Sequence, residues 1–256
     1  MDTKKVIDHI VQWLKDYADQ SGNRGFVIGV SGGIDSALTS TLCALTGLEV
    51  LCLEMPIHQA ASQVNRAQNH INWLKKNYPN VREHHVELTG VFDALVNTLP
   101  QHDATEQQFL ALANTRARLR MSTLYYFAGL HRYLVAGTGN KVEDFGVGFF
   151  TKYGDGGVDI SPIGDCLKTE VWKMGKELKI LDDIIMADPT DGLWSDGRTD
   201  VDQLGMSYKE LEIAMQDPSD KNYTKYLELR IKNLHKMKPI PVCKFDGKTT
   251  LETDKK

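Results

Sequence analysis

Cysteine, proline and long hydrophobic runs are scarce in this chain of 256 residues, which has four cysteines and eight prolines. Cys43, Cys52, Cys166 and Cys243 form no C-x-x-C pair and stand beside apolar neighbours. A zinc site and a disulfide framework are therefore not expected, and we interpret all four as buried or incidental thiols. The most apolar stretch, residues 42–55, includes glutamates and is shorter than the ~20 apolar residues of a membrane span, so no membrane segment is predicted.

An excess of one charge is also missing, because 30 basic and 34 acidic residues give a net charge of −4 and an isoelectric point near 6.1. Dedicated nucleic-acid-binding proteins usually carry a positive field, so no nucleic acid is expected as a partner. The N-terminal segment has helical spacing and no small-residue cleavage site, which argues against a signal peptide and favours a cytoplasmic protein.

Apolar runs and helical patterns alternate along the first half of the chain. Strands are predicted at residues 25–30, at 50–55, in a segment that ends at 86–88, and at 133–138. Helices are predicted near the N-terminus and at residues 35–45, 63–76 and 106–130. This alternation is typical of an α/β fold with a doubly wound, mostly parallel sheet flanked by helices, which binds ligands at the carboxyl ends of its strands. We expect one domain over residues 1–256.

Two segments rich in glycine and aspartate are predicted to be loops in the second half of the chain. The first begins at Gly146 and continues to residue 157, and the second, residues 187–205, has the composition of a mobile lid. A capping-box pattern at residues 207–210 and helical spacing through Leu234 predict helices after them. The last dozen residues are expected to fray.

The most informative motif is Ser31-Gly32-Gly33-Ile34-Asp35-Ser36, between a predicted buried strand and a predicted helix. Backbone N–H groups and the positive end of a helix converge on an anion at such a turn, so the motif predicts a phosphate-binding loop. The alternative is a glycine-rich turn in which Asp35 or Ser36 only caps the helix. The lysine of a P-loop nucleoside triphosphatase is missing, and no G-x-G-x-x-G follows the strand.

The Ser-Gly-Gly-x-Asp-Ser loop resembles that of the ATP pyrophosphatases, which split ATP between its α- and β-phosphates and transfer the adenylyl group. The loop does not choose among GMP synthetase, asparagine synthetase, tRNA-modifying enzymes and NAD synthetase. Further segments are similar to NAD synthetases: residues 114–121, Gly137-Thr138 with Glu143, residues 148–159, Leu167-Lys168, residues 189–194 and residues 199–205. The resemblance covers residues 25–236 and implies the adenine nucleotide alpha hydrolase-like fold.

The resemblance implies an ATP-dependent ligase that amidates deamido-NAD with ammonia to NAD, through an adenylated nicotinate, in the last step of NAD biosynthesis. It implies ATP contacts at Gly29, Ser31, Gly32, Gly33, Asp35, Ser36, Thr138, Lys168 and Thr190. It implies deamido-NAD contacts at Arg118, Lys152, Asp159, His235 and Lys236. Asp35 and Glu143 are the expected Mg²⁺ ligands, and Asp35 and Lys168 are the expected catalytic residues.

The resemblance also implies a homodimer. Glutamine-dependent family members carry an amidase domain ahead of this one, and the phosphate loop here begins at residue 31, so we expect no such domain. Free ammonia is the expected nitrogen donor, with a separate glutaminase as the alternative source. Two rival hypotheses are an enzyme that adenylates tRNA and a non-catalytic sensor of adenine nucleotides.

The sequence leaves open the orientation of three arginines and the role of two phenylalanines. The spacing of Arg116, Arg118 and Arg120 on one predicted helix does not decide which arginine points inward. Phe149 and Phe150 can either stack on a base or belong to the core.

Overall fold

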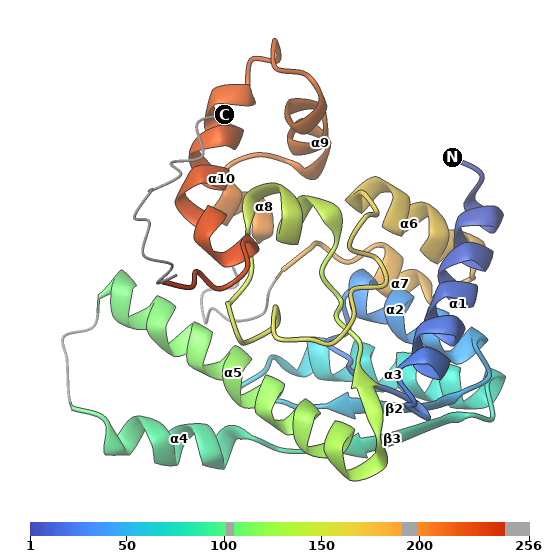
Figure 1. The fold of residues 1–256 in the computed structure, drawn as a ribbon. Coiled ribbons are helices and arrows are strands. Elements are labelled where there is room, and N and C mark those ends of the chain that lie inside the picture. Colours follow the sequence, from blue (N-terminus) through green and yellow to red (C-terminus); the bar gives the residue numbers. More distant parts are fainter. Residues whose placement is uncertain (101–104, 191–198, 244–256) are drawn as a thin grey trace.

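The computed structural model describes residues 1–100, 105–190 and 199–243, and within them it contains a parallel four-stranded sheet (Figure 1). The strands are β1 (Gly25–Gly29), β2 (Glu49–Glu54), β3 (Val81–His85) and β4 (Tyr133–Val135), in the order β3-β2-β1-β4. Gly25 pairs with Glu49 of β2 and with Tyr133 of β4, so β1 is an inner strand. Its apolar sequence fits this position, because both of its faces are covered.

Helices cover both faces of the sheet, as the alternation of the sequence predicts. Those of this part are α1 (Thr3–Gln20), α2 (Ile34–Leu45), α3 (Ala61–Asn77), α4 (Thr89–Thr98), α5 (Glu106–His131) and α6 (Lys168–Glu177). Phe26 and Ile28 of β1 share a core with α1, α2, α3 and α6, whereas Val27 shares one with α4 and α5. Because successive residues of a strand point to opposite faces, this division confirms the doubly wound α/β architecture.

The third strand ends earlier than predicted. β3 ends at His85, while residues 86–88 lead into α4, a helix that the sequence pattern did not reveal. The N–H of Val86 still donates to the carbonyl of Glu54. Val86 and Leu88 are apolar because they pack in the core that α4 and α5 share with Val27. β3 itself was hard to recognise because only Val81 is apolar and buried, and the charged and histidine residues that follow it are exposed or half-buried on an edge strand.

The fourth strand is shorter than predicted, because regular pairing stops at Val135. Its carbonyl accepts hydrogen bonds from the N–H groups of Asp159 and Ile160, and Ala136 forms only an isolated bridge with Ile160. A returning segment therefore occupies the edge where a longer strand would have continued.

The C-terminal part forms a separate cluster of helices. It contains the π-helix η1 (Lys141–Val147), α8 (Asp200–Leu204), α9 (Tyr208–Gln216) and α10 (Tyr223–Met237). The short helix α7 (Asp182–Ile185) instead packs through Ile184 and Ile185 in the core that Phe26 and Ile28 share with α2 and α6. η1, α8, α9 and α10 share a third core, and α8, α9 and α10 lie together at the end of the molecule opposite α4 (Figure 1). The predicted loops are thus partly helical: η1 extends to Val147, and a Thr199–Asp202 capping box starts α8 inside residues 187–205.

The remaining expectations from composition concern the cysteines and the membrane. Cys43, Cys52 and Cys166 are buried, Cys243 is exposed, and all four are free thiols, as predicted. Burial raises the pKa of the Cys52 thiol to about 12, so this group is an inert part of the core. Over the described ranges, no helix has the length and hydrophobicity needed to cross a membrane. The expected fraying falls within residues 244–256, outside the described residues.

Candidate active site

The phosphate loop lies between β1 and α2, and its backbone geometry requires glycine. Gly32 has a φ of +82°, and a Cβ there would lie 2.8 Å from the carbonyl oxygen of Gln63 in α3. The Ser36 hydroxyl closes the loop by donating to the carbonyl oxygen of Gly33 at 3.0 Å and accepting from the N–H of Ser31 at 3.2 Å. The loop is therefore held in shape by its own hydroxyl groups, without a ligand.

The alternative interpretation of this loop as a simple capped turn is wrong. Gly33 is the N-cap residue of α2, and among the described residues no side chain makes a capping hydrogen bond to this helix. Asp35 and Ser36 lie within the helix, and the Asp35 carboxylate points away to another cluster. The first N–H groups of α2 are thus open to an anion, together with the positive end of the helix dipole.

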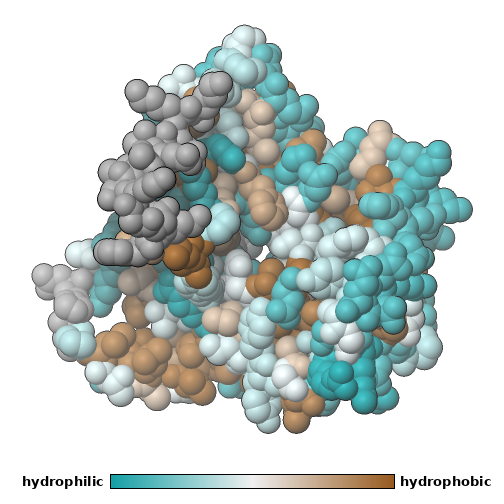
Figure 2. Space-filling model, viewed as in Figure 1, coloured by the Kyte–Doolittle hydropathy of each residue, from teal (hydrophilic) through white to brown (hydrophobic). Residues whose placement is uncertain are grey.

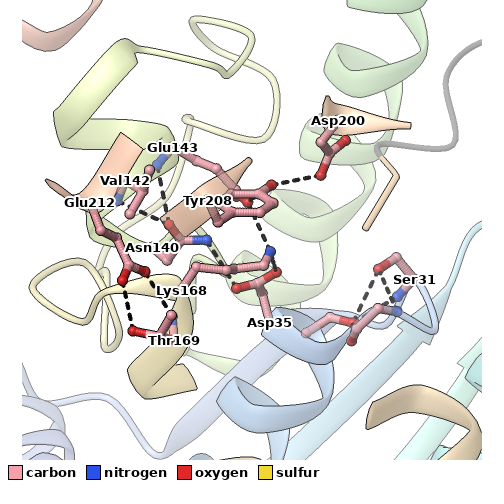
Figure 3. Close-up of polar contacts among 12 residues, drawn as sticks. Ser31, Asp35, Asn140, Val142, Glu143, Lys168, Thr169, Asp200, Tyr208 and Glu212 are labelled. Carbon is pink, nitrogen blue, oxygen red and sulfur yellow. Dashed lines mark hydrogen bonds and ion pairs between the residues drawn. The ribbon is translucent and has the colours of Figure 1, made fainter. Parts of the chain in front are cut away.

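A lysine and two carboxylates meet next to the phosphate loop (Figure 3). The Lys168 ammonium, at the first turn of α6, lies 2.5 Å from Oδ2 of Asp35 and 2.8 Å from Oε1 of Glu143. The Lys168 side chain is only 3% exposed, and the two carboxylate side chains are 17% and 15% exposed. These residues come from α2, η1 and α6, so only the folded chain brings their charges together.

Burial and charge act against each other in this cluster. Burial raises the pKa of Asp35 above its ordinary value, because the opposing effect of Lys168 is smaller. Burial acts in the same way on Glu143, but the Lys168 charge and the hydrogen bonds to it outweigh burial and lower the pKa of Glu143. Burial alone would lower the pKa of Lys168, yet the two carboxylates raise it, so the ammonium stays charged at neutral pH.

Two further residues hold the cluster, and neither was singled out from the sequence. Nδ2 of Asn140 donates to Oδ1 of Asp35 at 3.1 Å, while its Oδ1 caps η1 by accepting from the N–H groups of Val142 and Glu143. The Tyr208 hydroxyl lies 2.5 Å from Oε1 of Glu143. Asparagine before a helix start is a recognisable N-cap signal. No local signal in the sequence points to Tyr208, which comes from α9.

The cluster and the phosphate loop line one cleft with a volume of about 290 Å³. All nine predicted ATP contacts and Glu143 lie on its walls: Gly29, Ser31, Gly32, Gly33, Asp35, Ser36, Thr138, Lys168, Thr190 and Glu143. They come from the carboxyl end of β1, the segment after β4, the first turn of α2, η1, α6 and the segment before α8. The structure thus places this whole set around one space, although its binding of ATP stays a prediction.

Of the three arginines on α5, Arg120 is the one that lines the cleft. Its Nε donates to the carbonyl oxygen of Met55 at 2.9 Å and its Nη2 donates to Oε1 of Gln59 at 2.8 Å. Burial lowers the pKa of Arg120 to about 10. Arg116 lies over the ring of Phe92, 4.6 Å from its centroid.

Four of the five residues predicted to contact deamido-NAD lie close together outside this cleft. Arg118 donates to the carbonyl oxygen of Lys152 at 3.3 Å, and the Lys152 ammonium donates to the carbonyl oxygen of His235 at 3.3 Å. The Lys236 ammonium donates to the carbonyl oxygen of Phe150 at 2.7 Å. The glycine-rich segment therefore contacts α5 on one side and α10 on the other, and Arg118, Lys152 and Lys236 lie along this rim.

Asp159 does not belong to this group. Its Oδ1 accepts from the Tyr125 hydroxyl at 3.0 Å and its Oδ2 accepts from the N–H of Val135 at 2.8 Å. It lines a separate shallow hollow together with Arg132. Its position at the end of β4 is explained by these structural hydrogen bonds, and its contact with a dinucleotide remains a prediction.

The two neighbouring phenylalanines have different surroundings. Phe149 packs against the core of the C-terminal helices and also lines the cleft. The Phe150 ring lies 5.0 Å from the Lys236 ammonium and fills the space beside Gly156, where a Cβ would lie 2.3 Å from the ring. Phe150 therefore has a packing role, whereas Phe149 takes part in both core and cleft.

The predicted lid, residues 187–205, can be followed only at its two ends. Pro189 and Thr190 line the cleft, and Asp200 at the start of α8 donates its N–H to the carbonyl oxygen of Pro189 at 3.1 Å. Residues 191–198, which include Trp194 and most of the proposed closing segment, lie outside the described residues.

The carboxylates of Asp35 and Glu143 fit a divalent cation. They already converge on one positive charge, the Lys168 ammonium, and carboxylate oxygens are the ligands that Mg²⁺ prefers. Within residues 1–100, 105–190 and 199–243, no group of three or more His, Cys, Asp or Glu side chains is placed to hold a metal. A pair of carboxylates is the arrangement expected when phosphate oxygens complete the coordination.

The fold and the cleft together define a nucleotide-binding protein with the adenine nucleotide alpha hydrolase-like fold. The NAD synthase family matches residues 6–244, and the chain belongs to this family. An NH(3)-dependent NAD(+) synthetase from Methanosarcina acetivorans is 39% identical over 220 residues, which cover 84% of this chain and 82% of the relative.

Two solved structures are similar over nearly the whole chain. The NMN synthetase from Francisella tularensis has a TM-score of 0.86 and 30% identity, and the match covers 96% of this chain and 100% of that chain. The NH3-dependent NAD synthetase from Campylobacter jejuni subsp. jejuni, in complex with the nitrate ion, has a TM-score of 0.75 and 27% identity. This match covers 95% of this chain and 100% of that chain.

Proposed function

We propose that this protein is an ammonia-dependent NAD synthase, a ligase that converts deamido-NAD, ATP and ammonia to NAD, AMP and pyrophosphate in the last step of NAD biosynthesis. The observation that carries the proposal is one cleft that combines an open phosphate loop with the buried Asp35, Glu143 and Lys168 cluster. Membership of the NAD synthase family supports the choice of reaction.

The chemistry needs no protein nucleophile. In the first step a nicotinate carboxylate oxygen bonds to the α-phosphorus of ATP while the bond to the β-phosphate bridging oxygen breaks and pyrophosphate leaves. In the second step ammonia bonds to the activated carbonyl carbon, AMP leaves with the electron pair of the C–O bond, and the nitrogen loses a proton. The protein contributes mainly by positioning the reactants and by stabilising negative charge on the phosphates.

Each part of the cleft has a task in this scheme. The backbone N–H groups at the start of α2 bind phosphate oxygens, and the Lys168 ammonium offsets the charge of the leaving pyrophosphate. Asp35 and Glu143 would hold Mg²⁺, which neutralises charge on the nucleotide phosphates when it is bound. Thr138 and Thr190 supply hydroxyl groups from two other walls of the same cleft.

We place the dinucleotide at the rim formed by α5, the glycine-rich segment and α10. Arg118, Lys152 and Lys236 supply the positive charge that a pyrophosphate and a nicotinate carboxylate require. His235 lies in the same group of contacts, and Asp159 is proposed as a ribose acceptor.

The test is pyrophosphate release by the purified protein with Mg²⁺ and ATP, in four reactions that add or omit deamido-NAD and ammonium, with NAD measured in parallel. We expect release that depends on deamido-NAD, and NAD only where ammonium is present. Release that ignores deamido-NAD, or none at all, would contradict the proposal and favour the tRNA or sensor hypothesis.

A second candidate is the amidation of nicotinic acid mononucleotide, the same chemistry on half of the dinucleotide. It is favoured by one observation: the NMN synthetase from Francisella tularensis has a higher TM-score to this chain than the NAD synthetase from Campylobacter jejuni. Measuring kcat/KM for both acids with the same enzyme preparation decides between the candidates. A higher value for the mononucleotide would replace deamido-NAD as the substrate.

Free ammonia is the proposed nitrogen donor, in a chain that we propose forms a single domain. The relative from Methanosarcina acetivorans is an NH(3)-dependent NAD(+) synthetase, which supports this choice. A separate glutaminase stays the alternative source, and activity with ammonium alone tests it. The cytoplasm is the proposed location.

We also propose that the protein is a homodimer. Exposed apolar side chains gather on α4 and the first turns of α5, and we name this surface the α4–α5 face: Val91, Leu95, Leu99, Phe109 and Leu110. Figure 2 shows the hydrophobic surface over α4. A contiguous apolar surface of this kind is typical of a subunit interface, and a second copy of the chain is its proposed occupant.

A further inference from the structure

Tyr208 reaches the carboxylate cluster from a helix that has no other part in the cleft. It is the first residue of α9 and is only 4% exposed, among the apolar residues shared by η1, α8 and α10. Its hydroxyl points into the cluster rather than into the core, as Figure 3 shows. Burying a hydroxyl is unfavourable unless it makes hydrogen bonds, so its partners have to explain its presence.

The hydroxyl and the ring of Tyr208 contact two different members of the cluster. The hydroxyl lies 2.5 Å from Oε1 of Glu143, the same oxygen that accepts from the Lys168 ammonium at 2.8 Å. The ring centroid lies 4.7 Å from that ammonium. Glutamate and lysine have long side chains with several rotatable bonds, so these contacts restrict the position of both charged groups.

The same hydroxyl also contacts α8, whose first residue lines the cleft. It lies 2.7 Å from Oδ2 of Asp200, the first residue of α8. The N–H of Asp200 donates to Pro189, which lines the cleft next to Thr190. One hydroxyl group therefore joins the end of the 187–205 segment to a proposed metal ligand.

We propose that Tyr208 is a positioning residue that holds Glu143 and Lys168 in place for the metal-bound nucleotide and connects them to α8. Tyr208 is not among the residues that line the cleft, so it acts through the two charged side chains. The inference rests on the proposed function for its effect on turnover, whereas its effect on metal binding does not require that function.

The direct test is Mn²⁺ binding to the full-length Tyr208→Phe protein in the presence of ATP, followed by electron paramagnetic resonance. Phenylalanine keeps the ring and the packing and removes only the hydroxyl. Removing a residue that orients a metal ligand typically weakens metal binding about 10- to 100-fold, and we expect a loss in this range. Tyr226→Phe, in the same core, is the matched control and should bind Mn²⁺ like the wild type.

A kinetic comparison separates positioning from substrate binding. We expect kcat of Tyr208→Phe to fall together with the affinity for Mg²⁺, while KM for the nicotinate substrate stays within about twofold, because the rim residues are untouched. Unchanged Mn²⁺ affinity in Tyr208→Phe would overturn the proposal. If wild type releases no pyrophosphate with either nicotinate substrate, the proposed function fails, but the Mn²⁺ measurement still decides the role of Tyr208.

A second variant keeps the test valid if Tyr208→Phe does not fold. Asp200→Ala leaves Tyr208 in place and removes its partner on α8, so we expect a smaller loss of Mn²⁺ affinity in the same direction. If both residues act through one hydroxyl, the double variant loses no more affinity than Tyr208→Phe alone. Fully additive losses would show that the two residues act independently and would overturn the connection to α8.

Discussion

At the residue scale, the function depends on charges that are balanced only inside the fold. Lys168 pairs with two largely buried carboxylates and offsets one of their two negative charges, and each member of this cluster comes from a different element. The cluster carries one positive and two negative charges, so a bound cation is accommodated by the remaining negative charge. Replacing any one of these three side chains changes the net charge of the cluster, so each replacement has an effect on activity that can be measured separately.

The first residue-scale prediction concerns Asp35. We expect Asp35→Asn to lower kcat by about 100-fold or more, because it removes a negative ligand for the metal and a partner of Lys168. The amide oxygen can still accept the hydrogen bond from Asn140, so the fold should survive. Steady-state pyrophosphate release measures the effect. Asp165→Asn, at an exposed ion pair with Lys141, is the control, and near-normal turnover of Asp35→Asn would refute the role.

The second residue-scale prediction concerns Lys152. We expect Lys152→Ala to raise KM for deamido-NAD more than KM for ATP, because Lys152 lies at the rim and not on the wall of the phosphate-loop cleft. Lys75→Ala, which breaks an exposed ion pair with Glu83, should change neither constant. The reverse order of the two KM effects would assign Lys152 to ATP.

At the scale of elements, α2 and α3 are joined beneath the phosphate loop by buried polar groups. Nε2 of His70 on α3 lies 3.0 Å from the Ser40 hydroxyl, which donates to the carbonyl oxygen of Ser36 at 2.7 Å. His70 has no exposed surface, and burial lowers its pKa to about 4, from an ordinary value of 6.5. The helix that carries the phosphate loop is thus supported by a neutral histidine.

This histidine predicts a pH dependence of stability. Between pH 6.5 and about 4 the unfolded chain binds a proton at His70 that the folded protein does not, so the free energy of unfolding falls as the pH falls. By about pH 4, this proton uptake has lowered the free energy of unfolding by about 3 kcal/mol. Denaturant unfolding at several pH values measures it. The free energy of unfolding of His70→Gln should depend less on pH than that of the wild type. His9→Gln, at an exposed histidine, is the control and should keep the wild-type dependence. If His70→Gln and the wild type have equal slopes between pH 6.5 and 4, the prediction is wrong.

At the scale of the whole molecule, the assembly state is the main prediction. We expect Leu95→Glu to convert a dimer to a monomer, because a charge in the middle of the α4–α5 face would be buried without a partner. Light scattering after size-exclusion chromatography measures the mass. Ile231→Glu, at an exposed apolar position on α10, is the control. A wild-type monomer would refute the dimer proposal directly.

Much of the architecture could be predicted because it depends on local patterns. The runs at 25–30 and 50–55 identified β1 and β2, and helical spacing identified α3 and α5 within a few residues. β3 and α4 were misjudged because β3 is a polar edge strand. β4 was predicted too long, since the segment around Ile160, far away in sequence, takes its hydrogen-bonding positions.

The sequence by itself determined the phosphate loop and the family, because each of the motifs that indicate them is a short run of neighbouring residues. The positive φ of Gly32 belongs to this local level, whereas the close approach of Gln63 in α3 is a tertiary contact. Only the tertiary structure decided that Arg120 rather than Arg118 lines the cleft, and that Asn140 and Tyr208 hold the charged cluster. The physical reason is distance along the chain: Tyr208 and Glu143 are 65 residues apart, and no local periodicity records a contact made when separate helices pack together.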